Sequence, residues 1–358
     1  MSTKKIEQQF QILRTLLAIG IAMVIAFVII CFISESPLET IRSFVLGPLE
    51  SKRKIGNIIT NLTPMLFVGT GVCLIFSANQ TNMAVEGGFF VGAMLATVAA
   101  TCLHLPIGLH TAICLIVGGL AGAAACAIPA FLFIKYNAKP VVSSIMVNNM
   151  CLYVGLFVIN HLVRDPGAGF LASYRFDKTA RIGEMIQGTG IHYGILIGIV
   201  ILVLGYLYLN KSKAGYEIRT VGRNVDFARY SGINVNYVIA KAQLIGGFLA
   251  GMGGAVEVLG MYKRFQYQAL TNHGFDGIMI GIMAAYNPKM LPLSALFLAY
   301  IRVGADCMQR NSDVPVELAN IMISIIVIMI VAERFLYKMK HKRIVAEAKK
   351  ELVERAEV

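Results

Sequence analysis

Charged residues are scarce in this chain. Only 15% of its 358 residues are Asp, Glu, Lys or Arg, whereas soluble domains contain about a quarter. Hydrophobic residues account for 57%, and the mean hydropathy is +0.69. A soluble protein of this size would need much more polar surface. Apolar runs of about 18–20 residues recur along the chain, and a helix needs that length to cross a bilayer. The composition therefore predicts an all-α, polytopic membrane protein.

Signatures of catalysis are also missing. The dipeptide Gly-Lys never occurs, so the chain cannot form the phosphate-binding P-loop GxxxxGK[ST]. Its seven cysteines include no CxxC pair, and its six histidines show neither metal-ligand spacing nor a Ser–His–Asp order. Basic residues flank the apolar runs instead of clustering on one segment. We therefore expect no enzyme activity, no cofactor, no metal and no nucleic-acid partner.

Ten apolar segments are predicted as helices. The first is long enough to span a bilayer and no small-residue cleavage site follows it, so it is interpreted as a transmembrane helix and not as a signal peptide. The segments are 16–33, 57–76, 83–102, 108–134, 141–163, 191–209, 238–259, 276–286, 291–308 and 318–336.

The region 276–308 needs an argument of its own. Asn287-Pro288 interrupts it, and proline removes a helical hydrogen bond. Dividing the region gives a full span and a short broken helix that must pack inside protein. The total of about ten helices then places both termini on one side. Proposed inside segments hold 19 Lys and Arg against 11 outside, which predicts a cytoplasmic N-terminus (1–15) and a basic cytoplasmic tail (337–358) around a single transmembrane domain (16–336).

Two long loops connect the predicted helices. The outside loop, 164–190, has apolar residues at 182, 185 and 186 that suggest a short surface helix. In the inside loop, 210–237, Asn224 can cap a short amphipathic helix with Asp226 in its first turn and Gly232 at its end. An ordinary solvated linker is the alternative. Three glycines would tether the short helix: Gly215, Gly222 and Gly232.

The inside loop is similar to a known family. Its sequence "GYEIRTVGRNVDFARYSGINV" resembles the cytoplasmic coupling loop of bacterial ABC importer permeases of the branched-chain amino acid, ribose and nucleoside group. Three other stretches resemble that family in the same order: "TNMAVEGGFFVGAM", "VVSSIMVNNM" and "GFDGIMIGIMAAYNPKMLPLSALFLAYIRVGADCMQ". The resemblance covers about residues 50–336 and is nearest to the nucleoside, or simple-sugar, subgroup.

The resemblance implies a type II-like permease bundle in the bacterial inner membrane that imports a nucleoside, a related riboside or a simple sugar. It implies three protein partners: an ABC ATPase subunit, a second permease subunit, identical or homologous, and an extracytoplasmic solute-binding lipoprotein that would meet the outside loop. It also implies that the helix in the inside loop docks on the ATPase. The coupling residues would be Asn224, Asp226, Ala228, Arg229 and Gly232.

Several polar residues fall inside predicted helices. A charge at bilayer depth costs about 3 kcal/mol or more, so each one either faces a pathway or anchors two helices. Glu86 beside Gly87-Gly88 and Asp276 at the broken helix are the strongest candidates for a solute pathway. Amides would suit ribose hydroxyls, and aromatic rings would suit a base. The predicted pathway residues are Asn82, Glu86, Phe89, Asn148, Asn149, Phe275 and Asp276.

The family pattern is altered at several positions, so the substrate stays open among purine or pyrimidine nucleosides, ribose-like sugars and flavin-like ribosides. The altered positions are Thr81, Met83, Ala84, Gly88 and Lys139 to Val141. An ATP-independent secondary transporter or channel would explain the intramembrane carboxylates equally well, but it leaves the inside loop without a role. The buried polar residues and the broken helix argue against a membrane scaffold that transports nothing.

Overall fold

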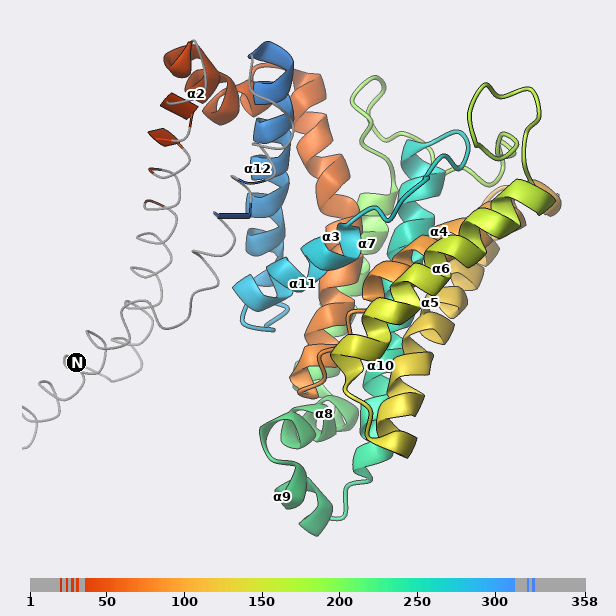
Figure 1. The fold of residues 1–358 in the computed structure, drawn as a ribbon, viewed down its shortest axis with the longest axis vertical. Coiled ribbons are helices and arrows are strands. Elements are labelled where there is room, and N and C mark those ends of the chain that lie inside the picture. The colour runs from red at the N-terminus through yellow and green to blue at the C-terminus, as the bar shows by residue number, and fades with distance from the viewer. Residues whose placement is uncertain are drawn as a thin grey trace, which may run out of the picture. The chain divides into compact units, whose positions relative to one another are not determined.

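The computed structural model describes residues 36–312 without a gap (Figure 1). It also describes nine isolated positions: 20, 24, 27, 28, 30, 31, 321, 324 and 325. The chain divides into two compact units. One unit is Leu49–Tyr300, called the main unit below, and the other combines Met1–Pro48 with Ile301–Val358. The prediction of a single transmembrane domain stays a prediction.

Most residues in the described part of the chain are helical, as the composition predicts. Seven of them are long and apolar enough to cross a membrane. These are α3 (Lys52–Ser77), α4 (Val85–Cys102), α5 (Leu109–Tyr136), α6 (Pro140–Leu162), α7 (Gly194–Lys211), α10 (Val235–Met261) and α12 (Leu291–Asn311). Between residues 36 and 312 the only β-structure is two isolated bridges, Arg164 with Ser173 and Glu184 with His192.

The predicted total of about ten helices is not confirmed. The predicted spans 16–33 and 318–336 and the tail 337–358 lie almost wholly outside the described residues. The predicted short helix 276–286 is α11 (His273–Met283), shifted by three residues. Its 11 residues extend about 16 Å, roughly half the thickness of a bilayer core. We therefore count seven candidate spans and one half-length helix in the described part.

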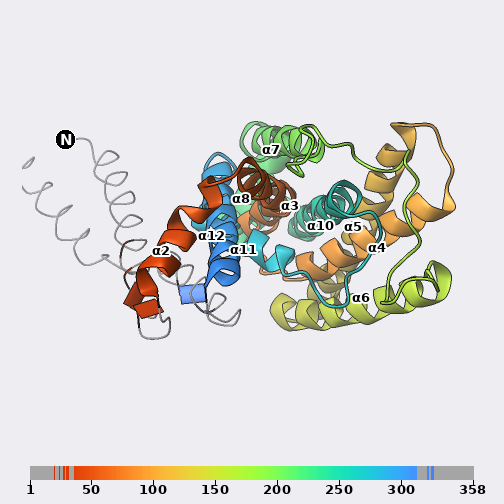
Figure 2. The same ribbon diagram turned by 90° about the horizontal axis from the view of Figure 1, so that it is seen from above.

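Helix α10 is the centre of the main unit. It packs against α3, α4 and α5, while α7 lies against α3 and α6 lies against α4 (Figure 2). Glycine makes this packing close. A Cβ atom on Gly251 would lie 2.2 Å from the carbonyl oxygen of Gly118, and one on Gly92 would lie 2.4 Å from the Cα atom of Gly251. Small residues allow such backbone contact between helices in lipid.

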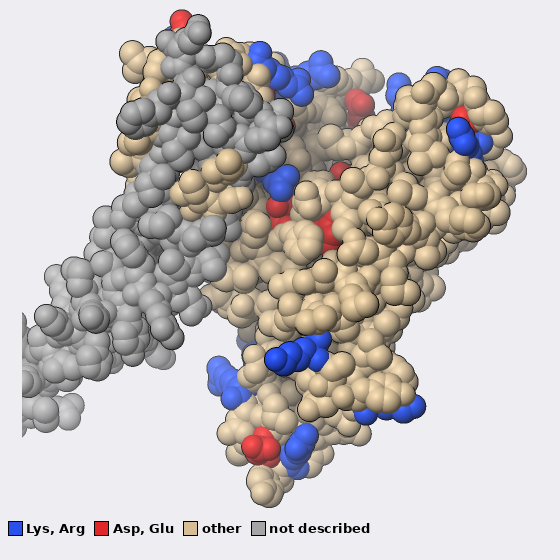
Figure 3. All heavy atoms as spheres, viewed as in Figure 1, with Lys and Arg blue, Asp and Glu red and all other residues tan. Residues whose placement is uncertain are grey.

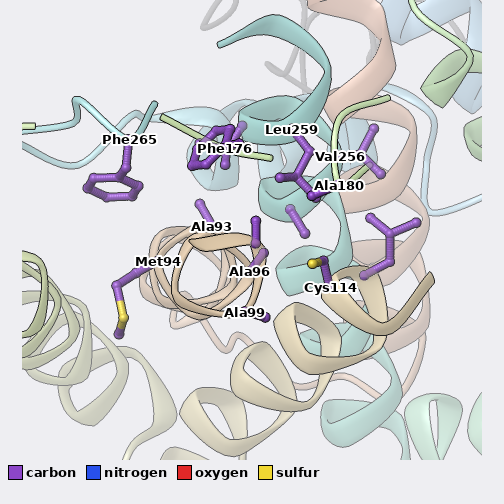
Figure 4. Close-up of a cluster of buried hydrophobic side chains, with 14 of the residues drawn as sticks. Ala93, Met94, Ala96, Ala99, Cys114, Phe176, Ala180, Val256, Leu259 and Phe265 are labelled. Carbon is purple, nitrogen blue, oxygen red and sulfur yellow. The ribbon is translucent and has the colours of Figure 1, made fainter. Parts of the chain in front are cut away.

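The outside loop is ordered by contacts with the helices. The amide of Ile182 donates to the carbonyl of Leu259 on α10 at 3.1 Å, and the amide of Ser173 donates to that of Phe265 at 3.1 Å. Phe176 and Ala180 enter the same hydrophobic cluster as Leu259 (Figure 4). The predicted surface helix at 182–186 is wrong, because this stretch is tied to α10 and to residue 191 by backbone hydrogen bonds instead.

The inside loop contains two helices at the opposite end of the main unit (Figure 1). Helix α9 (Val225–Tyr230) is the one predicted, and α8 (Lys213–Arg223) was not. Gly215 and Gly222 lie inside α8, so the prediction that they tether the short helix is wrong. A Cβ atom on Gly215 would lie 2.2 Å from the carbonyl oxygen of Tyr208, and one on Gly222 would lie 2.0 Å from that of Ser77. Both glycines serve close packing.

The other unit contains α2 (Pro37–Val45), the short η1 (Gly47–Leu49) at its boundary and the end of α12. A helix at 37–45 was not expected, because no helix was predicted between the segments 16–33 and 57–76. A Cβ atom added to Gly304 would lie 2.6 Å from the carbonyl oxygen of Phe44. One added to Gly47 would lie 2.8 Å from the Cβ atom of Cys307. These contacts pack α2 and η1 on α12.

Candidate functional site

Glu86 lies in the first turn of α4, and its side chain is completely buried. Its carboxylate accepts hydrogen bonds from the backbone amides of Asn272 at 2.7 Å, Gly274 at 2.6 Å and Phe275 at 3.3 Å. These amides belong to the N-terminus of α11, where a helix leaves its first amides without internal partners. An anion is stabilised there by the helix dipole as well. Glu86 therefore caps α11 from another helix.

Glycine at position 274 makes this cap possible. A Cβ atom there would lie 2.4 Å from the Cα atom of Glu86. The residue before α11, Asn272, has φ +64°, and Ala285 and Tyr286 after its end have φ +49° and +55°. Non-glycine residues adopt this left-handed conformation infrequently. Both ends of α11 thus depart sharply from helical geometry, so α11 is a separate half-length helix.

A second cluster of polar side chains surrounds His273, the first residue of α11. Its Nε2 atom lies 3.1 Å from Oε1 of Glu257, and its Nδ1 atom lies 3.8 Å from Oδ2 of Asp276. The two acids are 4% and 1% exposed. The ring of Phe89 covers the imidazole at a centroid distance of 5.4 Å. The contact with Glu257 therefore links the first residue of α11 to α10.

Two tyrosines and a second histidine lie near Glu257. Burial raises the pKa of Tyr262 to about 12 and that of Tyr267 well above its ordinary value, with the Glu257 carboxylate as the second cause in both. Burial also lowers the pKa of His192, which the same carboxylate partly opposes. The Nδ1 atom of His192 accepts a hydrogen bond from the backbone amide of Gly194 at 3.2 Å. The hydroxyls therefore stay protonated and His192 stays neutral, which makes them hydrogen-bond donors at physiological pH.

Asn82 fastens the turn that precedes α4. Its side-chain amide donates to Oε1 of Gln243 on α10 at 2.6 Å and to the carbonyl of Cys126 on α5 at 3.2 Å. Its Oδ1 atom accepts the amide of Ala84 at 2.8 Å. Asn82 and Gln243 are wholly buried. One amide side chain thus joins three parts of the bundle.

Asn148 fastens the same turn from α6. Its Oδ1 atom accepts the amide of Gly87 at 2.8 Å, and its Nδ2 atom donates to the carbonyl of Met83 at 3.0 Å. The hydroxyl of Ser144, one turn earlier on α6, accepts the amide of Met83 at 3.0 Å. Asn149 differs, because it is exposed and bonds to the carbonyl of Ile145 on its own helix.

Most of the predicted pathway residues are therefore brought together around the first turns of α4 and α11. Phe89 and Phe275 belong to one apolar cluster beside them, and Asn149 lies apart. Contact between these residues and a solute stays a prediction. The structure adds four residues to this group that were not among the predicted pathway residues: Glu257, His273, Tyr267 and Gln243. For Glu257, an acid within an apolar helix was the available signal; the other three join the group through contacts distant in sequence.

The predicted coupling residues lie on or beside α9. Asn224 caps the helix, since its Oδ1 accepts the amide of Phe227 at 3.0 Å, and Asp226 lies in the first turn. Gly232 follows the helix with φ +77°. Ala228 is completely buried in a cluster with α8 and α10. Ala228 thus anchors α9 to the bundle.

The outward face of α9 carries aromatic residues that the sequence did not single out. Phe227 is 56% exposed and Tyr230 is 93% exposed, and Arg229 is exposed between them. Basic side chains gather around this end of the main unit, and most of the visible face beyond it is uncharged (Figure 3). Exposed aromatic residues clustered with an arginine are typical of protein-binding surfaces.

Comparison with known proteins agrees with this architecture. The family described as "Branched-chain amino acid transport system / permease component" matches residues 54–331. The guanosine ABC transporter permease protein NupP of Bacillus subtilis is 29% identical over 77% of this chain and 80% of its own length. The nucleoside ABC transporter permease protein NupB of Lactococcus lactis is 24% identical over 89% and 90%. The glucose ABC transporter permease protein TsgB13 of Haloferax volcanii is 25% identical over 88% and 85%. The chain therefore belongs to the branched-chain amino acid transport system permease family.

Proposed function

We propose that this chain is the permease subunit of an ABC importer for a nucleoside, a related riboside or a simple sugar. It is a multi-pass membrane protein, and we assign it to the bacterial inner membrane with both termini in the cytoplasm. The three similar proteins named above are permeases for guanosine, nucleosides and glucose. These names support a solute with hydroxyl groups. Purine nucleosides are the first solutes to test.

The α8–α9 unit is the observation that carries this proposal. It lies beyond the candidate spans at one end of the main unit, and it exposes Phe227 and Tyr230 while Ala228 is buried in the bundle. An ATPase subunit that bound this face could move α8, α9 and the start of α10 together. An ATP-independent carrier leaves this aromatic surface without a partner.

The solute pathway is proposed to pass the first turns of α4 and α11. Asn82, Glu86, Asn148 and Asp276 gather there, and the half-length helix α11 begins among them. Broken helices at such positions form the sites of many transporters, because their ends present backbone polar groups. In this chain three of those backbone groups donate hydrogen bonds to Glu86. Glu86 would therefore shape the pathway by fixing the position of α11.

The remaining partners follow from the same proposal. A second permease subunit, identical or homologous, would complete the pathway, and an ATPase would bind α9. A solute-binding lipoprotein would meet the loop 164–190 at the opposite end. That loop exposes Phe170 and Tyr174, each to 50%.

Co-purification of the full complex tests the proposal. The paired substitutions Phe227→Ala and Tyr230→Ala should release the ATPase from the permease without lowering the amount of permease in the membrane. Tyr174→Ala removes an exposed aromatic ring at the other end and is the control. Full retention of the ATPase by the paired variant would contradict the proposal, as would equal loss with the control.

A further inference from the structure

A groove lies between α3, α7 and α10, next to the start of α8. Its volume is about 510 Å³, within the range of about 300–1,000 Å³ usual for small-molecule sites. Most of its wall is aliphatic. The lining residues that matter here are Leu74, Leu204, Leu207, Tyr208, Lys211 and Ser212.

The arrangement of the helices explains the groove. Both α7 and α10 pack on α3 but hardly touch each other. Leu74 of α3 forms the floor and is 1% exposed, whereas Leu204 and Leu207 on the α7 side are 54% and 45% exposed. All three helices are candidate membrane spans. With these helices placed in a bilayer, the open side of the groove would face acyl chains.

One end of the groove is polar. Lys211 is exposed there at the last residue of α7, and Ser212 follows it. The hydroxyl of Tyr208 is buried and makes no hydrogen bond within the described part of the chain. Between residues 206 and 223 the chain has four basic residues, Lys211, Lys213, Arg219 and Arg223, and one acid, Glu217. This excess of positive charge favours an anion.

We propose that the groove binds one anionic phospholipid, with an acyl chain along the aliphatic wall and the phosphate at Lys211. The aliphatic wall excludes a polar solute, and the bilayer supplies acyl chains at this depth. Because α8 begins two residues after Lys211, the lipid would also stabilise the position of α8; this last consequence rests on the proposed function.

Native mass spectrometry of the purified full-length chain tests lipid binding directly. Phosphatidylglycerol and phosphatidylcholine are added at equal concentration after delipidation. Leu204→Trp fills the groove, and Val203→Trp adds the same ring on a neighbouring exposed residue that does not line it. We expect at least fivefold less bound phosphatidylglycerol for Leu204→Trp, unchanged binding for Val203→Trp, and loss of the preference for phosphatidylglycerol in Lys211→Ala. Equal binding in all variants would overturn the site, and equal binding of both lipids to the unmodified chain would overturn its anionic character.

Photolabelling gives an independent readout on the unmodified chain. Phosphatidylglycerol with a diazirine in its acyl chain should label peptides containing residues 201–212 and 245–249 more strongly than the exposed outer face of α6. Labelling of α6 alone would show that another occupant covers the groove and would overturn the proposal. Neither measurement uses transport or ATP, so failure of the lipid site and failure of the importer function are distinguishable.

Discussion

The carboxylate of Glu86 accepts the backbone amide of Gly274 at 2.6 Å, although 188 positions separate these residues in the sequence. The contact joins the first turn of a membrane-spanning helix to the first turn of a helix too short to span. It explains the presence of an acid in an apolar segment. The negative charge of Glu86 is matched by the free amides and the dipole of α11, so the half-length helix is held at a fixed place.

Removing the charge of Glu86 should loosen α11. Glu86→Gln keeps the size of the side chain but replaces one acceptor oxygen by an NH₂ group that faces backbone donors. Hydrogen bonds to a charged group contribute about 1.5–3 kcal/mol, and we expect a loss of stability of that order. The measurement is the thermal unfolding midpoint in detergent. Glu39 is exposed in the first turn of α2, so Glu39→Gln should leave that midpoint almost unchanged. Equal midpoints for both variants would refute the cap.

A methyl group at position 274 should have a similar effect for a steric reason. In Gly274→Ala, the new Cβ atom would lie 2.4 Å from the Cα atom of Glu86, and this backbone atom cannot move aside as a flexible side chain could. We expect α11 to shift and its amides to exchange hydrogen faster, as measured by hydrogen exchange with mass spectrometry. Gly169→Ala meets no atom within 4 Å and is the control. Unchanged exchange in α11 would contradict the contact.

Asn82 and Gln243 should be coupled energetically. Each single change to Ala leaves the buried amide of the other without its 2.6 Å partner, while the double change removes both. A buried polar group without a partner costs about 1–3 kcal/mol. We therefore expect the double variant to unfold at a temperature close to that of the less stable single variant. Additive losses in a double-mutant cycle would show that the two amides act independently.

The glycines of α10 offer a graded test of helix packing. Gly251→Ala would bring a Cβ atom to 2.2 Å from the carbonyl oxygen of Gly118, whereas the nearest atom to a Cβ on Gly253 lies at 3.0 Å. We expect Gly251→Ala to reduce the folded fraction strongly and Gly253→Ala to reduce it less. Fluorescence-detected size-exclusion chromatography of both variants measures this order. The reverse order would mean that α4, α5 and α10 do not cross at Gly251.

Sequence patterns predicted the existence of the helices well and their contacts poorly. Runs of apolar residues indicated α3 to α7 and α10 to within a few residues, because bilayer thickness imposes length. Asn287-Pro288 indicated the short helix, and Asn224 indicated the cap of α9. Helix α8 was missed because it is amphipathic and contains two glycines, Gly215 and Gly222. These glycines resemble loop residues until their close contacts with Tyr208 and Ser77 are known.

The candidate site shows the same limit. Asn82, Glu86, Asn148 and Asp276 were recognisable as polar residues in apolar surroundings. Their partners Gln243 and His273 were not, because tertiary folding brings these residues to them from distant parts of the sequence. The exposure of Phe227 and Tyr230 was likewise invisible, since a six-residue helix buries whichever face its neighbours cover. Local patterns report helix length and caps, and long-range packing decides which polar groups meet.

The ratio of ATP hydrolysed to solute imported tests the central claim most directly. Gly232 and Gly188 both have φ +77° with no atom within 4 Å of a Cβ position, so valine strains the backbone equally at either place. Gly232→Val disturbs the end of α9, and Gly188→Val disturbs the outside loop. In proteoliposomes holding the complete importer, we predict that Gly232→Val keeps ATP hydrolysis but lowers guanosine uptake at least tenfold, while Gly188→Val keeps the ratio of the unmodified protein. An unchanged ratio in Gly232→Val would contradict the claim that α9 couples ATP hydrolysis to transport.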